Sequence, residues 1–402
     1  MTGDARRGDR EASFIAVLVL ATAVGPFAMQ VFLPALPAIQ KGFGVSAAEA
    51  QLVFSLSAFS IAFSMLAYGP ISDRFGRRPA LLGGLAVYLV GSVICAVASG
   101  IWLLILGRIV QAAGGSAGLV LTRAIVRDRY GLERSAEMLA YVTVAMVAAP
   151  MMAPALGGVL AEVLGWRAVF WVGVGLGVLT LAVVWRALPE TRHPGSAPVS
   201  RNPLHGFGQL LRSSAFMGYV LNGAWSIGVF YAFLAAAPFV VMVVMGRGAG
   251  EYGLIFMLVP GAYMVGNFLA GRYSARVGTD RMILLGSLGA LLATLLMTAL
   301  MVAGLWSPWA LFLPTAGAAF AQGIAMPNAQ AAFVSVAPHI AGAASGLGGF
   351  LQMGTAAVVA QIVGSIQDGT PHPMAVGMTL CALAALVSAQ VAIRGSRVGS
   401  RR

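Results

Sequence analysis

Charged side chains gather in residues 69–79, Gly-Pro-Ile-Ser-Asp-Arg-Phe-Gly-Arg-Arg-Pro, between two long apolar runs. The stretch places one carboxylate, Asp73, beside the guanidinium groups of Arg74, Arg77 and Arg78. So polar a stretch in so apolar a chain predicts a turn outside lipid. Opposite charges there could hold two parts of the protein together, and we expect such a latch. The alternative is a solvated turn whose arginines only orient the chain in a membrane.

Arg108 is a basic residue inside an apolar run rather than in a connection. It lies about six residues from the predicted outer end of that run, roughly 9 Å deep at helical rise. A charge at that depth is costly unless it faces the protein interior, which predicts a functional residue. Arg108 and Gln111 continue with Gly115, Gly118 and Thr122 along one helix face, at spacings of 3, 4, 3 and 4. The alternative is that Arg108 extends to the outer surface.

The first apolar run carries a matching stripe of Thr22, Pro26, Gln30 and Pro34. Gln30 lies near the depth of Arg108, so the two could meet. None of the 13 acidic residues lies in the middle of a run. Arg108 must therefore be satisfied by Gln30, backbone carbonyls, water or an anion, since an unpaired buried charge is too costly.

Two hypotheses follow for the chemistry of this interior. In the first, Arg108 binds a polar or anionic group of a substrate. In the second, protons use Glu162, near the outer end of the fifth run.

Aromatic and amide side chains in the second half suit an amphipathic organic solute. The candidates for a cavity are Asn222, Trp225 and Tyr231, with Tyr263, Asn267, Gln322, Asn328 and Gln352 as further members. Each one alone is more often a hydrogen bond between membrane helices. The four histidines have no metal-ligand spacing and no phosphate-binding loop is present, so we expect no metal site and no cofactor.

Composition sets the class of protein. Apolar residues make up 59% of the chain and charged residues 9%, which is typical of a membrane protein. The net charge of +12 would suggest nucleic acid in a soluble protein, but here the arginines lie between apolar runs, so nucleic-acid binding is not expected. Cys95 and Cys381 lie within apolar runs and are expected to be core residues.

Twelve runs of roughly 20 residues are each long enough to cross a bilayer as a helix, so we expect an all-α membrane protein with lipid as its surroundings. They are Phe14 to Ala38, Gln51 to Tyr68, Ala80 to Ser99, Trp102 to Ile125, Glu137 to Val163, Ala168 to Ala187, Ala215 to Met245, Gly253 to Gly271, Met282 to Trp306, Trp309 to Ala331, Gly342 to Ile366 and Met374 to Ile393.

Most arginines fall in alternate connections and at the chain ends, whereas the other connections hold Lys41, Arg167 and Arg247. Positively charged loops stay in the cytoplasm, which predicts that both termini are cytoplasmic.

The sequence divides into two halves. The expected units are a first six-helix bundle over 1–187, a cytoplasmic linker over 188–213 and a second bundle over 214–402, and the linker carries a short amphipathic patch from Leu204 to Leu211. A shift of 202 residues superimposes Gly69, Arg74 and Gly76 on Gly271, Arg276 and Gly278, and a similar shift relates Phe32-Leu33 to Phe233-Leu234 and Gln30 to Tyr231. Such repeats imply a cavity between the halves that opens to either side.

These motifs resemble the major facilitator superfamily and, within it, the twelve-helix drug:proton antiporters. Residues 69–79 resemble its loop signature, which implies a gating role for Gly69, Asp73 and Gly76. Residues 108–117 resemble the fourth-helix signature. Residues 149–158, with Pro150, Pro154, Gly157 and Gly158, resemble the antiporter signature, which implies export.

Residues 33–37 and 123–128 are similar to the bicyclomycin and chloramphenicol resistance branch. That branch typically has an acid at the place of Gln30, so this chain departs from its pattern.

The sequence thus predicts an inner-membrane secondary transporter, a monomer and not an enzyme, that exports a drug or metabolite against protons by alternating access. Alternatives are an uncoupled facilitator, which Gln30 favours, an exporter of one polar or anionic metabolite, and a receptor on the same fold. A membrane enzyme would need a buried set of acids, histidines or metal ligands, which the sequence does not provide.

Overall fold

The computed structural model describes residues 2–192, 207–337 and 340–399, and within them every regular element is helical. The first half contains α1 Thr2–Val31, η1 Leu33–Ala35, α2 Leu36–Phe43, α3 Ala47–Phe75, α4 Arg77–Ala96, α5 Ile101–Leu164 and α6 Trp166–Ala187. The second half contains α7 Phe207–Arg212, α8 Ser214–Phe239, the π-helix η2 Val240–Val244, α9 Ala249–Phe256, α10 Leu258–Val277, α11 Thr279–Val302, α12 Pro308–Ser335, α13 Ala341–Ser365 and α14 His372–Gly399.

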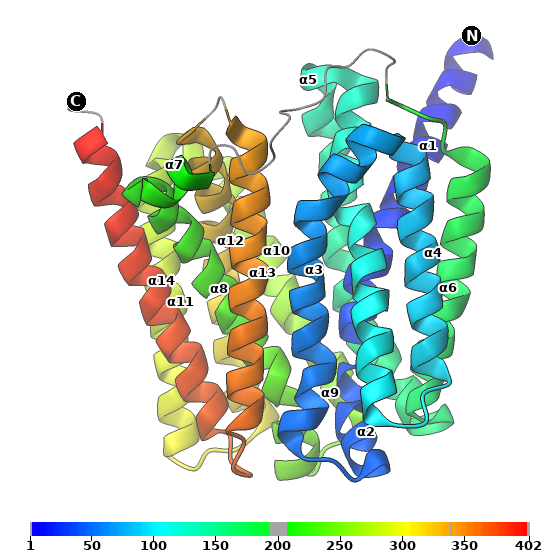
Figure 1. Ribbon diagram of the computed structural model, residues 1–402. Helices are drawn as coiled ribbons and strands as arrows, with labels where there is room; N and C mark the ends of the chain where they lie inside the picture. The colour runs from blue at the N-terminus through cyan, green and yellow to red at the C-terminus, as the bar shows by residue number, and fades with distance from the viewer. Residues whose placement is uncertain (1, 193–206, 338–339, 400–402) are drawn as a thin grey trace.

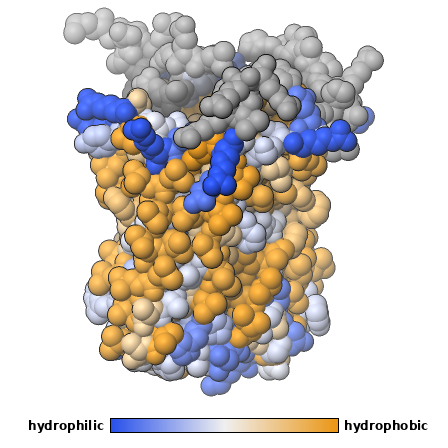
Figure 2. Space-filling model, turned by 90° about the vertical axis from the view of Figure 1, so that its left-hand side faces the viewer, coloured by the Kyte–Doolittle hydropathy of each residue, from blue (hydrophilic) through white to orange (hydrophobic). Residues whose placement is uncertain are grey.

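Long apolar helices and an apolar surface mark a multi-pass membrane protein. Eleven spans among the described residues are long and apolar enough to cross a bilayer, and Ala148–Leu164 adds a shorter apolar helix. Figure 2 shows apolar side chains covering the middle of the visible face, with hydrophilic side chains gathered towards both ends. Large apolar side chains such as Trp102 and Phe268 are exposed at 64% and 70%, as lipid-facing residues should be. The predicted all-α membrane fold is confirmed.

Both chain termini lie at the same end of the helix bundle (Figure 1). The terminal face is the end at which α1 begins and α14 ends, with the α3–α4 junction and α7 beside them. The opposite face is the end that holds α2 and the beginning of α9. The predicted linker patch falls partly in α7, where Leu210 is buried and Leu211 exposed, while Leu204, His193, His205 and His339 lie outside the described residues.

Proline divides two of the predicted spans. The first span ends as α1 at Val31, and the chain continues as η1 and α2, whose first turns contain Pro34 and Pro37. The eighth span is α9 and α10, which meet at Met257, three residues before Pro260. Proline has no N–H to donate and clashes with the preceding turn, so helices restart at these positions.

The predicted fourth and fifth spans form one helical element, α5, of 64 residues. A straight helix of that length would measure about 96 Å. However, Arg167, just after its end, donates from Nη2 to the carbonyl of Ala98, just before its beginning, at 2.9 Å. Both ends of α5 therefore lie together at the opposite face, and the element reverses direction at the terminal face (Figure 1).

The prediction of a turn over residues 69–79 was wrong in extent. Helix α3 continues to Phe75 and α4 begins at Arg77, so a single residue, Gly76, separates them. Its φ of +101° favours glycine, because a Cβ is strained there. Gly278, 202 residues later, separates α10 from α11 with a φ of +92°. The repeat seen in the sequence is therefore a structural repeat.

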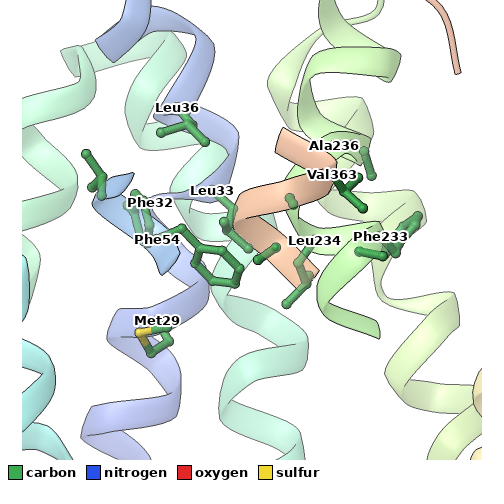
Figure 3. Close-up of a cluster of buried hydrophobic side chains, with 14 of the residues drawn as sticks. Met29, Phe32, Leu33, Leu36, Phe54, Phe233, Leu234, Ala236 and Val363 are labelled. Carbon is green, nitrogen blue, oxygen red and sulfur yellow. The ribbon is translucent and has the colours of Figure 1, made fainter. Parts of the chain in front are cut away.

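Apolar side chains from both halves form one core where the halves meet (Figure 3). Leu33 and Phe54 of the first half lie beside Leu234 and Val363 of the second. Helices α3 and α13 pack against each other along this boundary, and α5 packs against α9.

Candidate functional site

Arg108 is buried in the first half, with 1% of its surface exposed. Its Nη1 donates to the carbonyl of Ala28 at 3.0 Å and to the side-chain oxygen of Gln111, and its Nη2 donates to the sulfur of Met29. The guanidinium carbon lies 4.0 Å from the ring centre of Phe32, a cation–π contact. Its Nε has no hydrogen-bond partner. Each described group that contacts this charge is neutral.

A chain of hydrogen bonds links Arg108 to α4 and α6. Gln111 donates to Ser92 Oγ at 2.8 Å, Ser92 donates to the carbonyl of Tyr88, and the Tyr88 hydroxyl donates to the carbonyl of Gly173. The spacing of 3 in the sequence therefore does bring Arg108 and Gln111 together, inside the first half. This network fixes the guanidinium against α1.

The structure places Gln30 apart from this network. Gln30 is half-buried, its side-chain oxygen has no partner, and the contacts of Arg108 do not include it. The two predicted stripes meet instead at Thr22 and Thr122, whose hydroxyl oxygens are 2.8 Å apart. Sequence spacing predicted the faces of α1 and α5 correctly, but not the direction of the Gln30 side chain.

In the second half, Asn222 and Tyr231 occupy different environments. Asn222 is buried and donates to Ser287 Oγ and to the carbonyl of Ala385, so it joins α8 to α11 and α14. Tyr231 is half-buried at the boundary, where its ring stacks on Phe54 of α3 at 5.2 Å and its hydroxyl donates to the sulfur of Met353.

The remaining candidates of the second half also differ in exposure. Trp225, Tyr263 and Asn267 are half-buried, whereas Gln322, Asn328 and Gln352 are buried. A small pocket between the halves lies at the opposite face, lined by Leu36, Gln40 and Gln51 and by Phe239, Gly364 and Gln367.

The charged side chains near Gly76 form a cluster at the terminal face. Arg77 donates from Nη1 to Asp73 at 2.6 Å and from Nε to Asp128 at 2.9 Å, and Arg78 donates to the carbonyl of Trp185. These partners all belong to the first half, and the described contacts of Asp73 do not include α13. The predicted pairing of Asp73 with an arginine is present, while its role in latching the halves stays a prediction.

Glu190, just after α6, was missed as a partner of this cluster. Its carboxylate accepts hydrogen bonds from the backbone N–H groups of Arg77 and Arg78 at the beginning of α4, at 3.0 and 3.2 Å. It also accepts from the N–H groups of Thr191 and Arg192. A Cβ on Gly76 would lie 2.6 Å from its Oε2. In the sequence, Glu190 is marked only by its place shortly before a proline-rich linker. That pattern is too weak to predict that its carboxylate caps α4.

These contacts lower the pKa of Glu190: partial burial opposes ionisation, but the donated N–H groups from Arg192, Arg77, Arg78 and Thr191 outweigh it. A depressed pKa stabilises the fold above the pKa of the unfolded chain, and that contribution is lost as pH falls through the folded pKa.

Glu190→Ala is therefore expected to lower stability at neutral pH by about 1 kcal/mol, the usual value of a helix cap. The measurement is the melting temperature in detergent across a pH series, in which the difference from the parent protein should vanish at low pH. Glu251→Ala, at an exposed acid of α9, serves as the control. Equal melting of parent and Glu190→Ala at neutral pH would contradict the capping role.

The halves approach closely at the opposite face, where α5 crosses α9. A Cβ on Gly158 would overlap the carbonyl of Ala249, and one on Gly253 would overlap the backbone of Ala155. Gly157, the residue before Gly158, instead packs on the carbonyl of Val31 within the first half. Pro150 and Pro154 lie within α5, and Pro154 is buried near this crossing.

Hydrogen bonds between the halves also lie towards the opposite face. Glu162 is exposed, and its Oε1 accepts from the backbone N–H of Gly250, at the beginning of α9, at 3.0 Å. Ser55 of α3 donates to Gln361 of α13, whose amide nitrogen donates to the carbonyl of Ala48 at 3.2 Å. These contacts join the two halves near the opposite face.

Comparison with known proteins agrees with this architecture. The family model described as Major Facilitator Superfamily matches residues 18–360. The chain is 28% identical to a Bicyclomycin resistance protein homolog of Haemophilus influenzae, covering 93% of this chain and 94% of the relative. It is 31% identical to a Chloramphenicol resistance protein of Pseudomonas aeruginosa, with 92% and 88% covered.

Among solved structures, a bacterial homolog of the human lysosomal transporter Spinster matches with a TM-score of 0.76 and 16% identity, covering 96% of this chain and 97% of that one. The xylose transporter XylE from E. coli matches with a TM-score of 0.71 and 14% identity, covering 93% and 96%. At these identities the structural matches concern the fold alone.

Proposed function

The chain belongs to the Major Facilitator Superfamily and is a multi-pass membrane transporter, and we propose that it exports small organic molecules against an inward flow of protons. The observation that carries the proposal is the close packing of α5 on α9 at the opposite face, where glycines let the two halves meet. In alternating access, such a contact must form and break in each cycle. The half-buried aromatic side chains at the boundary suit an organic solute.

The orientation and division of the chain follow from the same proposal. The arginine-rich terminal face lies in the cytoplasm, and the opposite face lies outside the inner membrane. Residues 1–187 and 214–402 act as the two moving units, joined by 188–213. The cluster of Asp73, Arg77 and Asp128 lies at the cytoplasmic end of the first unit and gates that side.

The names of the relatives supply the first compounds to test. Chloramphenicol uptake into inverted membrane vesicles, with a pH gradient imposed across the membrane, measures export directly. We expect accumulation that an uncoupler abolishes and that vesicles without the protein lack. An absence of movement for chloramphenicol and for a panel of uncharged antibiotics would contradict the proposal.

Glu162 is the proposed proton site, because its hydrogen bond to Gly250 joins the halves. Protonation removes the negative charge and weakens this acceptor, so acid outside should favour opening of the opposite face. The charged groups beside this contact are Arg247, just before α9, and Glu251 of α9.

Glu162→Gln keeps an acceptor oxygen but cannot ionise, so transport should continue while its dependence on outside pH falls severalfold. The rate of chloramphenicol transport against outside pH is the measurement, and Glu251→Gln is the matched control. Unchanged pH dependence in Glu162→Gln would place the proton site elsewhere.

An uncoupled facilitator is the second candidate. The observation in its favour is Gln30, a neutral side chain in a chain whose described acids lie at or near the ends of the apolar spans or between them. The same vesicle experiment separates the two: accumulation that ignores the pH gradient would support the facilitator.

A further inference from the structure

The interior of the first half carries a positive charge, that of Arg108, with no acidic partner among the residues that the structure describes. The described partners of the Arg108 guanidinium are a carbonyl, an amide oxygen, a thioether sulfur and an aromatic ring, and its Nε has none. The acids whose side chains the structure places lie at or near the ends of the apolar spans or in connections: Glu11, Glu49, Asp73, Asp128, Glu162, Glu190, Glu251, Asp280 and Asp368. The electric field of the Arg108 guanidinium therefore reaches beyond its immediate contacts, because neutral groups do not cancel its charge.

Aromatic rings connect this charge to the boundary between the halves. The guanidinium carbon lies 4.0 Å from the Phe32 ring centre, and Phe32 and Phe54 have ring centres 6.3 Å apart. Arg108 is thus no more than about 10 Å from Phe54, whose ring stacks on Tyr231 of the second half at 5.2 Å. These apolar rings exclude water from the space between Arg108 and the boundary, so the electric field of the guanidinium is only weakly screened there.

We propose, on the basis of the proposed function, that this transporter takes uncharged or anionic aromatic molecules at the boundary and rejects cations of the same shape. Arg108 is the positioning charge: it is too deeply buried to contact the solute, and it acts through its field. At roughly 10 Å and an effective dielectric constant near 20, one unit of solute charge changes affinity roughly tenfold. The half-buried side chains of Trp225, Tyr231 and Met353 supply an aromatic and polarisable surface that suits such a solute.

Tetraphenylborate and tetraphenylphosphonium test this proposal, because they share shape and size and differ in the sign of their charge. Binding of each ion to the purified full-length protein in nanodiscs is measured by equilibrium dialysis, with the binding to empty nanodiscs subtracted. The anion is expected to bind on the order of 100-fold more tightly than the cation, since the two differ by two charge units.

Two variants separate the effect of the Arg108 electric field on ion binding from the effect of side-chain packing. Gln30→Glu adds a negative charge at the half-buried position on α1 and leaves every contact of Arg108 in place, so the ratio of affinities should fall roughly tenfold. Arg108→Gln should lower the ratio similarly if the protein folds. Arg247→Gln, at an exposed arginine of the opposite face, is the control and should leave the ratio unchanged.

Equal affinity of the parent protein for the two ions, absence of saturable binding of either, or a ratio that Gln30→Glu leaves unchanged would each overturn the proposal. Chloramphenicol transport is measured separately in proteoliposomes. Transport of chloramphenicol together with equal ion affinities would contradict the charge selection and leave the proposed export intact.

Discussion

Gly158→Leu is expected to reduce transport about 5- to 150-fold while the protein still folds. A Cβ at this position would overlap the carbonyl oxygen of Ala249 in the other half, so the larger side chain must hold α5 and α9 apart. Overpacking of a close contact costs about 1–3 kcal/mol, and a two-state equilibrium biased by that amount changes its populations about 5- to 150-fold. The opposite face should therefore remain open, and the cycle should stop there.

Spin labels report this opening directly. Labels at Lys41→Cys and Ile366→Cys lie on exposed positions of the two halves, and both native cysteines are buried. The distance between the labels is expected to increase in Gly158→Leu. Gly175→Leu is the matched control, because a Cβ at Gly175 of α6 meets open space. A Gly158→Leu protein with parental transport and parental label distance would contradict the proposed gate.

Gly118→Leu is expected to prevent folding rather than to alter the cycle. Gly118 of α5 packs on the backbone of α1, where a Cβ would overlap the carbonyl of Ala21. Gly115 contacts Gly25 along the same crossing, and the Thr22–Thr122 hydrogen bond follows it. Because the contact joins the backbones of α1 and α5, no side chain can move away to make room. We therefore expect the free energy of unfolding to fall by at least about 3 kcal/mol.

The measurement for Gly118→Leu is the yield of monodisperse protein by size-exclusion chromatography together with its melting temperature. Gly83→Leu provides the comparison, since a Cβ at this helical glycine of α4 has no neighbour within 4 Å. It is expected to fold and melt like the parent protein. Parental melting of Gly118→Leu would show that the α1–α5 crossing can separate at little cost.

The fold could be predicted from the sequence because apolar spans are local patterns and the repeat is a simple shift along the chain. The relation of Gly76 to Gly278 was readable from a shift of 202 residues, and both glycines end a helix in the structure. The placement of Arg108 and Gln111 on one helix face followed from their spacing of 3, and in the structure the two side chains are hydrogen-bonded. Each of these inferences needed only the geometry of a single helix or a simple repeat.

Contacts between helices were harder to predict because they depend on how each helix is rotated and tilted. Gln30 and Arg108 were expected at one depth, but the guanidinium is held by Ala28, Met29 and Phe32 instead. Glu190 and Asp128 are distant in sequence from Arg77 and carry no pattern that relates them to it. The close approach of Gly158 to Ala249 likewise exists only once the halves are packed.

The single-residue junctions at Gly76 and Gly278 have a mechanical consequence. A single glycine separates α3 from α4, and another separates α10 from α11. The two helices of each pair therefore cannot slide lengthwise past each other, and the backbone can rotate between them only at that glycine. Since α3 packs along α13, a tilt of α3 at the boundary must be transmitted to α4 on the outside of the first half. In the proposed alternating-access cycle, lipid around α4 and α11 is thus displaced, so the lateral pressure of the bilayer acts as a load on transport.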